Sequence, residues 1–138
     1  MNSAPAGRAT SYWLPLAFLA TAVAAFLGMS WNLLEPRMSF PMGTKAMLVA
    51  ALVAAAVCRV GGKSPPLVTA GVVGIAVPSG ALLAMLVSTF KDPTSQNLWP
   101  LAVGALTVTA LAASSVGTLA GSFLLLLWRG VSGGRNAA

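Results

Sequence analysis

Two carboxylates, one thiol and no histidine are all that this chain offers for acid–base, nucleophilic or metal chemistry. Glu35 and Asp92 each precede a proline, and Cys58 lies within an apolar run. Without histidine, the chain lacks the commonest general base and a frequent ligand of zinc, copper and haem. If the two carboxylates met, they could hold a cation or act as an acid–base pair. Each has a basic neighbour, Arg37 or Lys91, so interfacial salt bridges are their expected use, and we expect no catalytic, cofactor or metal site.

The other polar residues inside the apolar runs are hydroxyls. Serine and threonine can hydrogen-bond to the carbonyl one turn earlier in a helix, so they need no other partner. An ionisable residue at mid-membrane depth, the usual mark of an ion pathway, is lacking. One alternative use is a polar strip for a neutral solute or an anion, formed by Thr107, Ser114, Thr118 and Ser122.

Composition places the chain in a membrane. Of its 138 residues, 57% are hydrophobic and only 7% are charged, whereas a soluble domain has about 25% charged residues. The net charge of +6 comes from single, scattered Lys and Arg residues, which is typical of charges that flank membrane spans and not of nucleic-acid binding. The lipid bilayer is therefore the first expected partner.

Four apolar runs have about the length that crosses a bilayer core. They lack the alternating pattern of barrel strands, so they predict helices. The sequence thus predicts one all-α transmembrane domain over residues 1–138, a four-helix bundle with polar tails at 1–11 and 129–138. The expected helices cover residues 12–34, 43–60, 66–90 and 98–128.

Four spans place both termini and the middle connection on one side of the membrane. That side carries five basic residues, and the other side carries three. Because cytoplasmic loops are enriched in Lys and Arg, both termini are expected in the cytoplasm. The five are Arg8, Arg59, Lys63, Arg129 and Arg135, and the three are Arg37, Lys45 and Lys91.

Small residues spaced by four predict where helices pack closely. Ala113, Gly117 and Gly121 form such a stripe on the fourth run, which serves either internal packing or a homodimer interface. Pro78 interrupts the third run and predicts a kink. That kink is either a hinge or a fixed packing feature.

The segment "KDPTSQNLWP", residues 91–100, reads as a structural corner. Asn97 is a good N-cap for the last helix, and Trp99 lies where an interfacial anchor belongs. The stretch resembles a loop, Pro-Thr-Ser-x-Asn-Leu-Trp-Pro, of uncharacterised small bacterial four-span membrane proteins. Gln96 stands where that loop often has histidine. The resemblance implies the bacterial inner membrane and no assigned activity.

Two functions stay open on this basis. Short connections, small-residue stripes and the lack of mid-membrane charge favour an accessory, assembly or interaction subunit, bound to a membrane-protein partner or to copies of itself. The alternative is a small channel or facilitator for a neutral solute or an anion.

We predict that Asn97→Ala lowers thermal stability in detergent by about 1 kcal/mol, because it removes a helix cap. Trp99→Ala should also lower stability, since it removes an interfacial anchor. Gln96→Ala is the matched control in the same loop and should change little. Loss of a measurable activity in Gln96→Ala at unchanged stability would show that the loop is a site.

Overall fold

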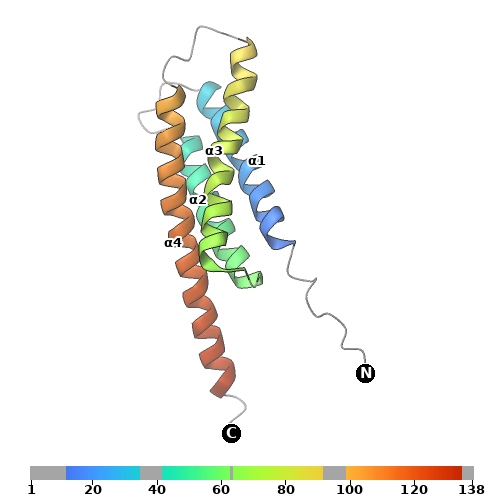
Figure 1. The fold of residues 1–138 in the computed structure, drawn as a ribbon, viewed down its shortest axis with the longest axis vertical. Helices are drawn as coiled ribbons and strands as arrows, with labels where there is room; N and C mark the ends of the chain where they lie inside the picture. Colours follow the sequence, from blue (N-terminus) through green and yellow to red (C-terminus); the bar gives the residue numbers. More distant parts are fainter. Residues whose placement is uncertain (1–11, 35–41, 63, 92–98, 135–138) are drawn as a thin grey trace.

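The computed structural model describes residues 12–34, 42–62, 64–91 and 99–134, and these form four packed helices (Figure 1). The chain is therefore all-α, as predicted. Asn97, Glu35 and Asp92 lie outside the described residues. The helices are α1 (Trp13–Leu34), α2 (Met42–Gly61), α3 (Pro66–Lys91) and α4 (Trp99–Gly134).

The helices follow each other around the bundle in the order α1, α2, α4, α3. Each contacts its two neighbours in that order, and α2 also contacts α3 across one diagonal. Within the described ranges, α1 and α4 make no contact across the other diagonal. The start of α1 and the end of α4 lie at the same end of the bundle (Figure 1).

Prolines and main-chain hydrogen bonds define the helix ends. Pro66 is the first residue of α3, a position where a missing N–H is not needed. The Thr69 N–H closes the first turn by donating to the Pro65 carbonyl at 3.0 Å. At the end of α2, the Gly62 N–H donates to the Cys58 carbonyl at 2.8 Å.

Small residues fill the interior, and large apolar residues cover the outside. Met47, Val73 and Val77 are the larger members of a core made otherwise mostly of alanine. Large apolar side chains, mostly leucine and valine, are exposed on every helix. Because all four helices are also long and apolar enough to span a membrane, the exposed side chains face lipid. The chain is a small four-span integral membrane protein.

Backbones approach closely where α4 crosses α2 and where α3 crosses α1. A methyl group added at Gly117 would overlap the Leu52 carbonyl of α2, and one at Gly121 would lie 2.7 Å from the Ala56 carbonyl oxygen. A methyl group at Gly80 would overlap the Ala22 carbonyl of α1. Gly80 follows the buried Pro78 by two residues in α3, and Ser79 Oγ donates to the Ile75 carbonyl at 2.9 Å.

The last helix is much longer than the others. Its 36 residues correspond to about 54 Å, and its C-terminal part continues past the ends of the other helices (Figure 1). The helix extends to Gly134, six residues past the Trp128 boundary expected from the sequence. Nothing between Trp128 and Gly134 is proline, so no residue there prevents the hydrogen-bond ladder from continuing.

We predict that Gly117→Ala destabilises the bundle by about 1–3 kcal/mol, because the new methyl group must push α4 away from α2. Gly104→Ala is the matched control on the same helix, since nothing lies within 4 Å of a methyl group there. It should leave stability unchanged or slightly higher. Thermal unfolding in detergent measures both variants. Equal changes in the stability of the two variants would show that α4 and α2 lie farther apart at Gly117 than the structure places them.

Candidate functional site

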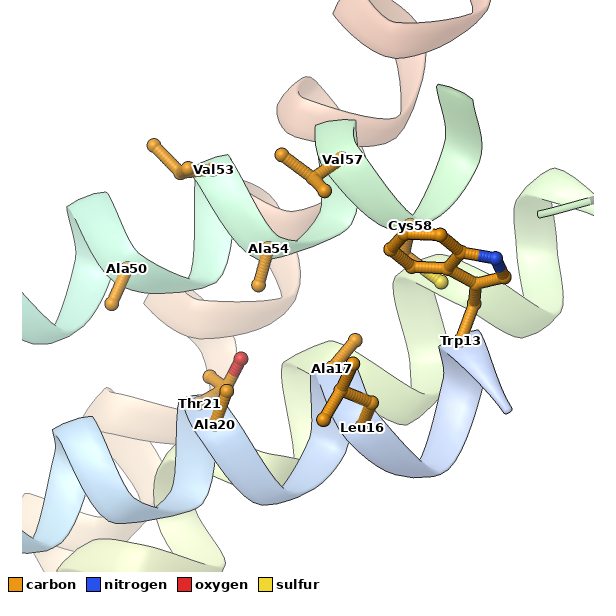
Figure 2. Close-up of a pocket in the computed structure, with 10 residues that line it drawn as sticks. All are labelled: Trp13, Leu16, Ala17, Ala20, Thr21, Ala50, Val53, Ala54, Val57 and Cys58. Carbon is orange, nitrogen blue, oxygen red and sulfur yellow. The ribbon is translucent and has the colours of Figure 1, made fainter. Parts of the chain in front are cut away.

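A groove runs between α1 and α2. It has a volume of about 360 Å³, and Figure 2 shows the side chains that line it. Alanines from both helices form much of its walls, and exposed leucine and valine side chains form its rims. The lining residues are Trp13, Leu16, Ala17, Ala20, Thr21, Ala50, Val53, Ala54, Val57 and Cys58.

A second cavity continues this groove toward the other end of the two helices. It has a volume of about 400 Å³. At about 100° per residue, its lining positions fall on the same stripe of each helix as those of the first cavity. We call the two cavities together the α1–α2 groove. The second part is lined by Ala24, Leu27, Gly28, Trp31, Gly43 and Ala46.

A tryptophan lies at each end of the α1–α2 groove. The Trp13 ring packs over Gly61, where an added methyl group would lie 3.0 Å from ring atoms. In Figure 2 the same ring lies beside Cys58, whose thiol is buried. Trp31 is exposed at the far end. Trp31 follows Trp13 by 18 positions, which corresponds to a rise of about 27 Å, close to the thickness of a bilayer core.

Thr21 contributes a hydroxyl group to the lining of the first part of the groove. The residue is 1% exposed, and among the described residues its hydroxyl is the only buried side-chain donor or acceptor without a hydrogen-bond partner. Figure 2 shows the hydroxyl on the side of α1 that faces α2. A buried, unsatisfied hydroxyl costs about 1–3 kcal/mol, so this position would gain from an added partner.

The other hydroxyls behave as the sequence predicts. Thr107 Oγ1 donates to the Val103 carbonyl at 2.7 Å, and Thr118 Oγ1 donates to the Ser114 carbonyl at 2.7 Å. The same pattern, with an acceptor three or four residues earlier, recurs at Ser30, Thr69, Ser79, Thr89, Thr109, Ser114, Ser115 and Ser122. Thr21 is the departure from this rule.

The predicted hydroxyl strip of α4 lies at helix contacts. Ser114 is fully buried and donates to the Ala70 carbonyl of α3 at 2.8 Å. Thr118 is 2% exposed. Ser122 accepts a hydrogen bond from Arg59 Nε at 2.9 Å. Ser114 and Ser122 therefore join α4 to α3 and to the end of α2.

The predicted site residues that the structure describes lie apart from this groove. Gly117 and Gly121 face α2, with Ala113 partly buried one turn earlier. Pro78 is buried inside α3. Trp99 is the first residue of α4. Sequence reasoning missed Thr21 as a special case, because nothing in its neighbours distinguishes it from the self-satisfied hydroxyls.

Comparisons with protein-family models, with curated proteins and with solved structures find no match to this chain.

We predict that Thr21→Val leaves the stability of the isolated chain unchanged or raises it by about 1 kcal/mol, because it removes an unsatisfied buried hydroxyl. Ser114→Ala is the contrasting variant. It removes a hydrogen bond between two helices and should cost about 0.6 kcal/mol. Unfolding in detergent compares the two. An equal loss of stability in both variants would show that the Thr21 hydroxyl has a partner within the chain.

Proposed function

We propose that this protein is a non-enzymatic accessory or assembly subunit that accepts a transmembrane helix of a membrane-protein partner in the α1–α2 groove. The observation that carries this proposal is the groove itself, an alanine-lined surface that faces lipid and contains the unpartnered Thr21 hydroxyl. The partner is another chain or a second copy of this one. We propose that the protein lies in the bacterial inner membrane with both termini in the cytoplasm.

Small side chains on both walls make the groove suitable for a helix. Ala20 and Ala24 on α1 are one turn apart, as are Ala46, Ala50 and Ala54 on α2. Such spacing lets a third helix approach closely, which is the main source of helix association in lipid. The groove also runs for about 27 Å, so a helix crossing the bilayer would contact it along its whole length.

Thr21 adds specificity to this surface. An apolar lipid chain has no group that can accept a hydrogen bond from its hydroxyl. A partner helix can supply one, from a polar side chain or from a main-chain carbonyl beside glycine, once its packing shifts the residues that bury the hydroxyl in the isolated chain. Interhelical hydrogen bonds of this kind contribute about 0.6 kcal/mol on average, which is enough to favour one register over others.

The channel alternative has less support from the described residues. Met47, Val73 and Val77 fill the interior with no exposed surface. The Ser114 and Thr118 hydroxyls are engaged in hydrogen bonds. A water-filled path would have to form between copies of the chain. Neither of these two functions assigns an activity to residues 91–100.

We predict that Ala20→Phe and Ala46→Phe abolish copurification of the partner, or self-association, after extraction into native lipid particles. Both positions are exposed walls of the groove, so a larger side chain blocks a helix without overfilling the core. Thr21→Val should weaken the same association while the chain stays as stable as before. Ala120→Phe is the matched control, because Ala120 is exposed on α4 outside the groove.

Two results would contradict the proposed function. One is a wild-type chain that runs only as a lone monomer in native lipid particles. The other is an association that survives both groove variants and is lost in Ala120→Phe, which would place the interface on α4.

A further inference from the structure

A second groove, at the end of the bundle where α1 begins and α4 ends, carries two guanidinium groups. It is bounded by the end of α2, the start of α3 and the C-terminal part of α4, and its volume is about 650 Å³. Arg59 of α2 and Arg129 of α4 both line it. We call it the basic groove.

Arg59 is held in a fixed position within the basic groove. Its Nε donates to Ser122 Oγ at 2.9 Å, and its Nη1 donates to the Ser64 carbonyl at 3.2 Å. Ser122 in turn donates to the Thr118 carbonyl at 2.9 Å. These partners are all neutral, so they orient the guanidinium, and no described residue compensates its charge. Arg129 follows Ser122 by seven residues, two helical turns, and so lies on the same face of α4.

The described part of the chain places no anionic side chain around this charge. The described residues include neither Asp nor Glu. The two carboxylates of the chain, Glu35 and Asp92, directly follow the last residues of α1 and α3. Those helix ends lie at the opposite end of the bundle (Figure 1). The start of α3 at Pro66 also lines the groove, and a helix N-terminus adds positive potential, although the C-terminal end of α2 offsets part of it.

The remaining walls of the basic groove are apolar. Leu119, Leu125 and Leu126 of α4 line it together with Val60 of α2. A soluble anion without hydrocarbon chains would make no apolar contact with these side chains. A ligand with a negative headgroup and hydrocarbon chains would contact both the guanidinium groups and the leucines, and basic pockets between transmembrane helices are known to bind anionic lipid headgroups.

We therefore propose that the basic groove binds one anionic phospholipid, with its phosphate between Arg59 and Arg129 and an acyl chain along the leucines of α4. Arg59 is the positioning cation, since Ser122 and the Ser64 carbonyl fix it. Arg129 is the second cation, carried by the part of α4 that continues past the other helices. This site is separate from the α1–α2 groove and does not depend on the function proposed there.

The test is lipid binding to the purified full chain, measured by native mass spectrometry and by the thermal shift that each lipid produces. The probes are dioleoyl phosphatidylglycerol, dioleoyl phosphatidylcholine with the same chains, and glycerol 3-phosphate as a headgroup without chains. Phosphatidylglycerol should bind with one saturable site and more tightly than phosphatidylcholine. Arg129→Gln should weaken its binding about fivefold, the effect of one cation near a membrane surface.

Lys45→Gln is the matched control, because it removes the same charge near the start of α2, far from the groove. It should leave phosphatidylglycerol binding unchanged. Arg59→Gln removes an α2–α4 contact as well as a charge, so it is compared with Ser122→Ala. Ser122→Ala keeps the Arg59 charge and loosens its position. Ser122→Ala should weaken phosphatidylglycerol binding less than Arg129→Gln does.

Three outcomes would overturn the proposal. Equal binding of phosphatidylglycerol and phosphatidylcholine would show that the groove does not distinguish an anionic headgroup from a zwitterionic one. Equal losses in Arg129→Gln and Lys45→Gln would show a general charge effect. A thermal shift from glycerol 3-phosphate as large as that from phosphatidylglycerol at the same concentration would identify a site for a soluble anion.

Discussion

Inside a bilayer, an apolar side chain gains little by leaving lipid for the interior of a protein, so helices must be held by contacts that lipid cannot supply. In this bundle those contacts are close approaches of one backbone to another. Gly117 and Gly121 bring α4 against carbonyl groups of α2, and Gly80 brings α3 against α1. The alanine-rich core is a consequence, because helices this close leave little room for larger side chains.

The same constraint explains how the bundle treats its polar atoms. A hydroxyl in lipid has no water to bond, so most described serine and threonine side chains donate to a carbonyl three or four residues earlier. Ser114 also donates to α3, and Ser122 accepts from Arg59, which ties three helices together at one end. Thr21 stands against this background as the described buried hydroxyl that has no hydrogen-bond partner in the isolated chain.

The all-α class and the four spans were predictable from the sequence, because length and hydropathy decide them without knowledge of packing. The stripe of Gly117 and Gly121 was also visible, since small residues spaced by four share a helix face. The helix against which this stripe packs was not predictable, because the spacing of residues on one helix does not determine which neighbouring helix they contact. Thr21 and Arg59 could not be selected from sequence. One depends on a side-chain orientation, and the other depends on the register of α2 against Ser122 of α4.

The length of α4 connects the fold to the basic groove. Its apolar stretch from Pro100 to Val131 has 32 residues, or about 48 Å, against a bilayer core of about 30 Å. Tilt alone would have to reach about 50°, beyond the range of about 0–40° seen for transmembrane helices, and α4 is also packed against α2 and α3. The excess length therefore lies toward the C-terminal end of α4, beyond Ser122, the residue that contacts Arg59. Apolar surface and two cations with no anionic neighbour among the described residues coincide there because α4 extends past the other helices. This coincidence is the reason that we propose an anionic phospholipid as the ligand.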